Sequence, residues 1–173
     1  VFTAVQVITP FYIEDRFGVI GREAVTRTAM FALLAMALVT LVVQIGVMQI
    51  FRLGPRILLR LAFFIFGAVL LMLGVAGELW QLYLLYAGMG LSFALAAPGL
   101  NAAASLSVGP REQGAVAGLL SAAPAFGMIF GPALGGAVYR VAPTLPMFAG
   151  GTAALLLGVF FLFVRVPEPS PAG

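Results

Sequence analysis

Side chains that commonly carry out catalysis are scarce in this sequence. It contains no Cys and no His, and all nine of its cationic residues are Arg. Cysteine nucleophiles, thiolate metal sites and disulfides are therefore excluded. The hydroxyl groups of Ser92, Ser105 and Ser121 have no base near them in the sequence, so they form no recognisable nucleophile–base pair. We predict that the protein is not an enzyme and that it uses no metal and no cofactor.

Polar side chains that could bind a ligand lie instead at helical spacing within apolar stretches. Five of them are spread over three stretches: Gln6 and Thr9, Gln44, and Tyr86 and Asn101. An amide in hydrocarbon needs a hydrogen-bond partner, so the three amides should face the interior of a helix bundle or a wet cavity. They could simply join neighbouring helices. Because three separate stretches supply them, we predict that the five residues line a shared substrate cavity.

The composition defines the elements that must position these residues. Hydrophobic residues make up 62% of the chain and charged residues only 9%, whereas a soluble domain has about half and about a quarter. Long apolar windows recur without the alternating ten-residue pattern of an outer-membrane barrel. We therefore predict an all-α integral membrane protein, in contact with the lipid bilayer. The net charge of +3 is too small to indicate a nucleic-acid partner.

The apolar stretches predict a six-helix bundle. Residues 1–13 would reach only ~20 Å as a helix, short of the ~30 Å hydrocarbon core, so we expect a partial first span whose beginning is missing. A charged connector is expected at 14–27. Five complete spans are expected at residues 28–51, 57–75, 82–106, 113–139 and 145–164. The transmembrane domain would cover residues 1–166, and the Pro-rich residues 167–173 would be a disordered cytoplasmic tail.

The arginines lie between the spans and indicate topology. Alternating connectors put five on one side, Arg52, Arg56, Arg60, Arg111 and Arg165, and four on the other, Arg16, Arg22, Arg27 and Arg140. The positive-inside rule then weakly favours a cytoplasmic location for the first side. Trp80 is expected to be an interfacial anchor. The third and sixth spans carry almost no polar side chain, so we expect that both can face lipid on all sides.

The fifth span, QGAVAGLLSAAPAFGMIFGPALGGAVY, is rich in glycine. Gly127, Gly131 and Gly135 recur every fourth residue and share one helix face, while Gly114 and Gly118 lie roughly on the opposite face. Membrane helices use small residues at this spacing to approach closely, because lipid supplies no hydrophobic drive. We expect this helix to contact two neighbours closely, one on each side.

The glycine-rich span also carries a family resemblance. The run GLLSAAPAFGMIFGPALGG is similar to the antiporter motif of the major facilitator superfamily, seen in its drug:proton antiporter branch. The matching positions are Gly118, Gly127, Gly131, Pro132, Gly135 and Gly136. A second run, with Arg52, Gly54 and Arg56, resembles the superfamily's cytoplasmic loop motif, G-x-x-x-D-R-x-G-R-R. It departs from that motif because Phe51 occupies the position of the Asp and Val47 that of the first Gly.

Several features place the resemblance in one half of a twelve-span transporter. Loss of the acidic loop residue, the TPFYIEDRFG ending of the first span and the EQG before the fifth are typical of the carboxyl-terminal half. The whole chain thus resembles spans seven to twelve, with span seven truncated. The antiporter motif is best known from span five, which makes the amino-terminal half the alternative. In the superfamily, spans seven and ten line the cavity, eight and eleven pack between the halves, and nine and twelve face lipid.

The resemblance implies a secondary transporter that works by rocking of two halves about a midplane site. We expect a multi-pass protein of the cell membrane, specifically a bacterial inner membrane, that exports a small amphiphilic, drug-like compound. Its partners would be that substrate, protons and the other half of the transporter. The acidic residues lie near span ends or in loops, and Glu14 and Asp15 are expected to form a solvated rim with Arg16. The coupling carboxylate would then lie in the other half. An uptake symporter, a uniporter and a non-transporting scaffold are the alternatives.

Overall fold

The computed structural model describes residues 2–47 and 53–164 of the 173-residue chain, and these residues form helices and no strands. The α-helices are α1 (Phe2–Phe17), α2 (Arg22–Val42), α4 (Pro55–Val75), α5 (Leu79–Leu106), α6 (Gln113–Val141) and α7 (Leu145–Phe163). A π-helical turn, η1 (Val43–Val47), extends α2. Arg52 of the predicted loop motif and the predicted tail at 167–173 lie outside the described residues. The predicted all-α class is confirmed.

Five helices are long and apolar enough to cross a membrane: α2 with its π-helical extension, α4, α5, α6 and α7. The last four predicted spans agree with the observed helices to within three residues at each end. The first helix, α1, has 16 residues and therefore reaches about 24 Å. The described residues thus form five complete spans and one shorter helix.

The predicted connector at residues 14–27 is wrong in its extent. α1 continues to Phe17 and α2 begins at Arg22, so only four residues join them. Gly18 and Gly21 make this turn possible, with φ of +63° and +101°, which other residues rarely adopt. Charged side chains near a membrane surface can reach water while their backbone stays helical. Charge alone therefore did not mark the helix ends.

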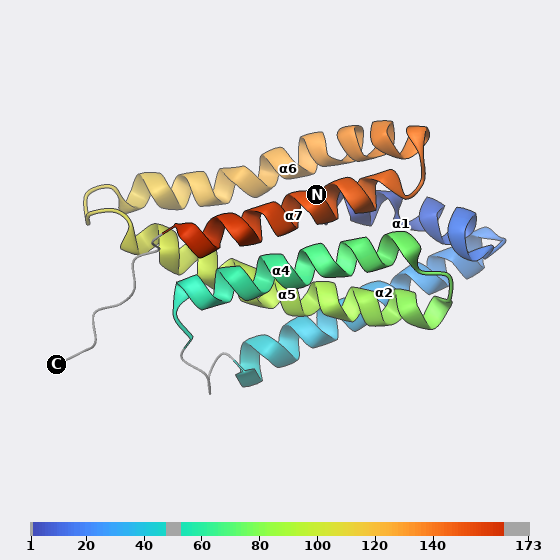
Figure 1. Cartoon of the computed structure of the whole chain (residues 1–173), viewed down its shortest axis with the longest axis horizontal. Coiled ribbons are helices and arrows are strands. Elements are labelled where there is room, and N and C mark those ends of the chain that lie inside the picture. The colour runs from blue at the N-terminus through green and yellow to red at the C-terminus, as the bar shows by residue number, and fades with distance from the viewer. Residues whose placement is uncertain (1, 48–52, 165–173) are drawn as a thin grey trace.

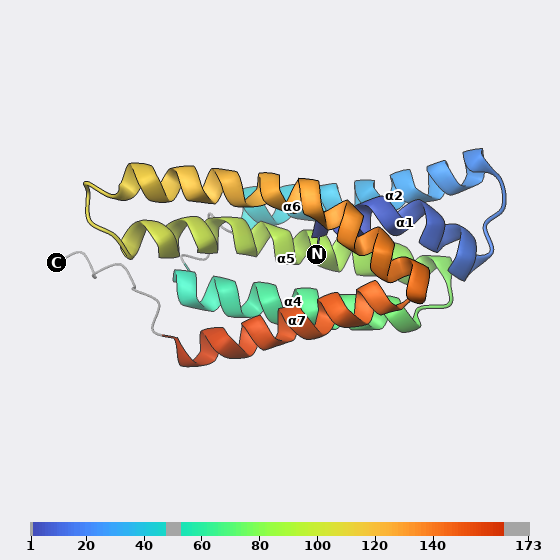
Figure 2. The same ribbon diagram turned by 90° about the horizontal axis from the view of Figure 1, so that it is seen from above.

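Five of the helices form an arc, and the short helix α1 lies between the two ends of this arc. Figures 1 and 2 show α6, α7, α4, α5 and α2 following one another around this arc, and each contacts the next. The short α1 packs mainly against α6 and also against α2. The α5–α6 turn and the end of α7 lie at one end of the bundle, here called the tail end, on the left in Figure 1. The α1–α2, α4–α5 and α6–α7 turns lie at the opposite end.

The expectation that α4 can face lipid on all sides is wrong. It occupies the middle of the arc between α5 and α7, and its Leu59, Leu70 and Leu73 are completely buried. α7 is also packed along one side, where Met147 is buried. Apolar side chains pack against other helices as readily as against lipid, so a helix without polar groups is not necessarily peripheral.

Close helix contacts occur at glycines of α4, α5 and α7. A Cβ atom added to Gly90 would lie 2.2 Å from the carbonyl oxygen of Met36 on α2. At the same place the Thr40 hydroxyl lies 2.9 Å from the Met36 oxygen and 3.0 Å from the Gly90 oxygen. Between α4 and α7, a Cβ on Gly67 would lie 2.9 Å from the Gly151 oxygen. Small residues therefore set the spacing of the arc.

Side chains of α1 cap the end of α4. The Tyr12 hydroxyl donates to the Leu73 carbonyl oxygen at 2.6 Å. One turn later, Arg16 donates through Nε to Ala76 at 2.9 Å and through Nη2 to Val75 at 3.3 Å. The last carbonyl groups of a helix lack partners within the helix and carry partial negative charge, so a cation stabilises them. These bonds tie α1 to α4 at the end opposite the tail end.

The tail end has an equivalent arrangement. Arg60 of α4 donates to the carbonyl oxygens of Phe161 and Leu162 in α7, at 2.9 and 2.8 Å. Arg56 adds a longer bond to Leu162, at 3.3 Å. Gly54 is the N-cap of α4, and its carbonyl oxygen accepts the first hydrogen bonds of that helix. Two arginines that the sequence assigned to a topological role therefore also cap the end of α7.

Candidate functional site

The predicted cavity residues Thr9 and Tyr86 meet in the core between α1 and α5. Thr9 is 3% exposed and Tyr86 is 1% exposed. The Thr9 hydroxyl donates to the Val5 carbonyl oxygen at 2.7 Å, and the Tyr86 hydroxyl is hydrogen-bonded to Thr9 Oγ1. Since the Thr9 proton is directed to Val5, Tyr86 is the donor to Thr9. In this bundle the pair joins two helices and satisfies two buried hydroxyl groups.

The other predicted cavity residues lie elsewhere. Gln6 is half-buried on α1, whereas Gln44 is exposed on η1 and Asn101 is exposed near the end of α5. Asn101 lies 15 residues after Tyr86 on one helix, which separates them by about 22 Å along its axis. The five residues therefore do not line one cavity within this bundle.

Asn101 lines a polar groove between α5 and α6 at the tail end, which we call the α5–α6 groove. Its volume is about 560 Å³. It is lined by Asn101, Ser105, Gln113, Gly114, Val116, Ala117, Leu120 and Ser121. The Ser121 hydroxyl donates to the Ala117 carbonyl oxygen at 2.9 Å. This groove therefore offers amide and hydroxyl groups to a ligand.

Among the polar residues of this groove, only Asn101 was predicted to line a substrate cavity. A signal was present, because Ser105 follows Asn101 by four residues and so shares its helix face. Gln113 and Ser121 share a face of α6 for the same reason, at a spacing of eight residues. What the sequence did not reveal is that the α5–α6 turn brings these two faces together.

A second groove, here called the α1–α2 groove, lies at the end opposite the tail end. Its volume is also about 560 Å³. It is lined by Pro10, Phe11, Glu14, Gly21, Arg22, Val25 and Thr26. Glu14 and Arg22 give it one charge of each sign, and Thr26 adds a hydroxyl group. Each groove therefore carries polar groups and opens near a different end of the bundle.

The expected rim of Glu14, Asp15 and Arg16 is wrong in its pairing. Arg16 is directed to the carbonyl groups that end α4. Asp15 instead accepts a hydrogen bond of 2.5 Å from the hydroxyl of Tyr139 near the end of α6. This bond joins α1 to α6. Among the described residues, no group of three or more His, Cys, Asp or Glu could hold a metal ion.

The glycines of the antiporter-like motif fall into two sets. Hypothetical Cβ atoms on Gly127, Gly131 and Gly135 would lie 3.8, 3.4 and 2.7 Å from Thr3 or Ala4 of α1. This stripe thus packs within the bundle, and the approach tightens towards Gly135. By contrast, Gly118 has nothing within 4 Å of its Cβ position.

The remaining small residues of α6 are also uncovered or partly covered. Gly114 and Gly136 have nothing within 4 Å of their Cβ positions, and Pro132 is half-buried. The expected second close neighbour of α6, on the side of Gly114 and Gly118, is therefore not provided by the described residues. That side of the helix is open.

The chain has five long apolar helices, and its polar groups gather in grooves or join helices through buried hydroxyls. These features define a polytopic α-helical membrane protein. The sequence model of the Major Facilitator Superfamily matches residues 1–173, so the chain belongs to that superfamily of secondary transporters. No curated protein matches the sequence.

Proposed function

We propose that this chain is the carboxyl-terminal half of a multidrug-type efflux transporter, which exports a small amphiphilic organic compound by alternating access in exchange for protons. The observation that carries the proposal is the uneven cover of the helices. Of the most apolar 18 residues in each helix, 50% are buried in α5, 17% in α2 and none in α6. The two least covered helices are the ends of the arc, so the bundle leaves one side open for a partner.

The superfamily resemblance supports the amino-terminal half as that partner. In spans seven to twelve, α2 and α6 correspond to spans eight and eleven, which in the superfamily pack between the two halves. The uncovered Gly114 and Gly118 then offer a surface on which a helix of the amino-terminal half can approach closely. The Gly127–Gly135 stripe has a different role in this proposal, since it packs against α1 of the same half.

The two polar grooves support alternating access. They involve the first two helices of each three-helix set, α1–α2–α4 and α5–α6–α7. Halves of these transporters contain inverted three-helix repeats, which explains why equivalent grooves open at opposite ends. A substrate path that opens first at one membrane face and then at the other needs polar groups at both ends.

The positions of the acidic residues support a proton site outside this chain. Glu14 and Asp15 are exposed at a helix end, and Asp15 already accepts a hydrogen bond from Tyr139. A coupling carboxylate normally lies within the membrane. We therefore propose that the coupling group belongs to the amino-terminal half.

Flux through proteoliposomes tests the proposed function. The complete gene product would be reconstituted, and movement of a fluorescent amphiphilic cation followed with and without a pH gradient. We expect flux that the gradient accelerates, and loss of that flux in Gly118→Leu, because the larger side chain would separate the halves. Thr152→Leu, on an exposed position of α7, is the matched control and should retain flux. Flux no faster than in protein-free liposomes would reject the transporter; gradient-independent flux would instead favour a uniporter.

The amino-terminal half is the second candidate, because the antiporter motif is best known from span five. Reading the coding sequence on both sides of the chain distinguishes the two. We expect six further spans before Val1, with an Asp in the loop between the second and third. Six spans after residue 173 instead would assign the chain to the amino-terminal half.

A further inference from the structure

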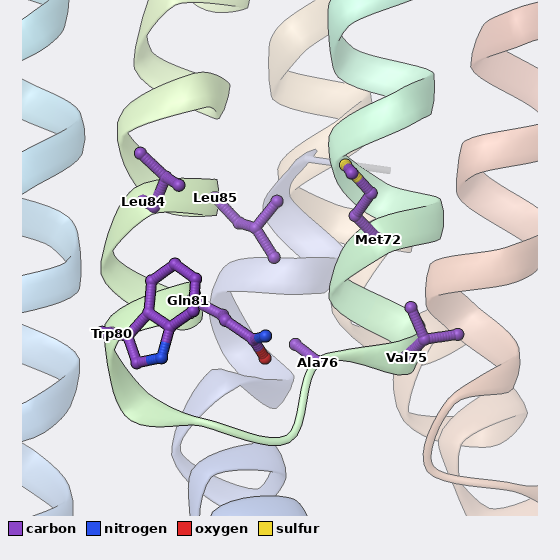
Figure 3. Close-up of a pocket in the computed structure, with 7 residues that line it drawn as sticks. All are labelled: Met72, Val75, Ala76, Trp80, Gln81, Leu84 and Leu85. Atoms are coloured by element: carbon purple, nitrogen blue, oxygen red, sulfur yellow. The ribbon is translucent and has the colours of Figure 1, made fainter.

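A groove between α4 and α5 lies apart from the two polar grooves. It is lined by Met72, Val75, Ala76, Trp80, Gln81, Leu84 and Leu85 and has a volume of about 230 Å³. Figure 3 shows these side chains near the α4–α5 turn, with α1 behind the pair of helices. The groove, here called the Trp80 groove, thus faces away from α1 and lies on the outer side of the arc.

The walls of the Trp80 groove are apolar and open to the surroundings. Met72, Trp80 and Leu84 are 60%, 62% and 62% exposed. Its volume is several times the ~30 Å³ that one water molecule occupies in the liquid, yet apolar walls give water too few hydrogen bonds. Because both helices cross the membrane, hydrocarbon from the bilayer is the material in contact with this surface.

Two hydrogen-bond donors lie at the end of the groove next to the turn. The Gln81 side-chain oxygen accepts from the backbone N–H groups of Gly77 and Glu78, at 2.9 and 3.1 Å. The oxygen is thereby fixed, and the NH₂ of the same amide remains to donate. The Trp80 indole N–H is also a donor only. In the described part of the chain, neither donor has an acceptor, and Figure 3 shows both at the turn end of the groove.

The order of these groups along the groove matches that of a lipid. Trp side chains prefer the level of the lipid headgroups, which puts the two donors at the depth of ester and phosphate oxygens. Leu84, Leu85 and Met72 lie deeper, at the depth of the acyl chains. Lipid oxygens are acceptors, and the groove supplies only donors at that level.

We propose that the Trp80 groove binds one phospholipid of the leaflet next to the α4–α5 turn, with an acyl chain along Met72 and Leu85 and its ester or phosphate oxygens on Trp80 and Gln81. The site depends on the membrane location of the chain and not on the proposed transport function. It would hold a lipid more tightly than the surrounding annulus because it adds hydrogen bonds to ordinary apolar contact.

The only tryptophan of the chain makes this site directly measurable. The purified protein in detergent micelles would be titrated with a phospholipid brominated on its acyl chains, which quenches nearby tryptophan. We expect quenching that saturates at a low mole fraction of lipid and is reversed by the same lipid without bromine. Quenching that rises in proportion to the mole fraction, without saturation, would overturn the proposal.

Variants separate binding at the groove from general lipid contact. Gln81→Glu keeps an oxygen for Gly77 and Glu78 but removes the NH₂ donor, so the apparent affinity should fall about three- to tenfold. Ala76→Leu should remove the saturable quenching by filling the groove. Leu156→Phe, on the exposed face of α7, is the control and should leave it unchanged. Equal titration curves for all four proteins would overturn the proposal.

Discussion

Replacing Gly90 by Ala tests the contact that sets the spacing of α2 and α5. The added Cβ would lie 2.2 Å from the Met36 carbonyl oxygen and 3.1 Å from Met36 Cα. Ordinary van der Waals contact begins at 3.4 Å, so the overlap exceeds 1 Å and involves backbone. A flexible side chain could rotate away, but the backbone of α2 can only move as a helix. The substitution should therefore push the two helices apart.

The expected loss of stability has two parts. Overpacking costs about 1–3 kcal/mol when backbone must shift. Separation of the helices also weakens the contact of the Thr40 hydroxyl with the Gly90 oxygen. An interhelical hydrogen bond in a membrane contributes about 0.6 kcal/mol of stability on average. The sum is roughly 2–4 kcal/mol. For domains of this size, 1 kcal/mol corresponds to about 2–4 °C, so the substitution should lower the unfolding midpoint by roughly 4–16 °C.

Size-exclusion chromatography after heating in detergent measures this midpoint without a thiol-reactive dye, which a chain without Cys could not bind. Gly136→Ala is the matched control, because Gly136 is helical and has nothing within 4 Å of its Cβ position. It should leave the midpoint unchanged or raise it, since Ala is the better helix former. A Gly90→Ala protein as stable as the wild type would show that this contact does not set the spacing of α2 and α5.

Four further substitutions test individual bonds. Thr9→Val should lower the stability by about 1–3 kcal/mol because the buried hydroxyl of Tyr86 loses its partner, and Tyr86→Phe should lower it less. Thermal unfolding compares the two variants. Equal losses of stability would contradict the assignment of Tyr86 as the donor. Arg60→Gln removes the hydrogen bonds to the last carbonyl groups of α7 and should therefore speed amide hydrogen exchange in that turn. Unchanged exchange would show that Arg60 does not stabilise the end of α7. Tyr139→Phe should cost below about 1 kcal/mol, since its acceptor Asp15 is exposed; a larger loss would show that this bond holds α1 in place.

The sequence predicted the membrane helices well because the bilayer imposes a simple rule. About 20 apolar residues are needed to cross it, and each later span of the chain meets that length. The rule fails where helices leave the hydrocarbon. Glu14 and Arg22 lie within helices, although their charge predicted a connector, because water outside the core tolerates a charged helix.

The candidate site was predicted only in part. Polar residues were correctly identified as needing partners, but the sequence does not say which partner. Thr9 and Tyr86 satisfy each other, whereas Asn101 lies beside residues of the following helix. Tyr12 and Arg16 bind backbone carbonyl groups about 60 residues away, and no side-chain pattern records such acceptors.

Small residues show the same limit. Gly127, Gly131 and Gly135 repeat regularly, and they do lie against α1. The close approach between α4 and α7 depends on Gly67 and Gly151. Each has a second glycine seven residues later, Gly74 and Gly158, a spacing on which the sequence prediction did not draw. A regular spacing indicates that residues share one face of a helix. How closely two backbones approach depends on which residues lie where the helices cross.

The proposed function depends most on the open side of α6, and photo-cross-linking tests that side most directly. Ile129 lies on α6 nearly opposite the Gly127–Gly135 stripe and is 67% exposed, while Leu156 of α7 is 65% exposed. Benzoylphenylalanine would replace each residue in the complete gene product, and cross-linked peptides would be identified by mass spectrometry. We expect peptides that join position 129 to the proposed amino-terminal half and none from position 156. Lipid adducts alone at position 129 would contradict the proposal.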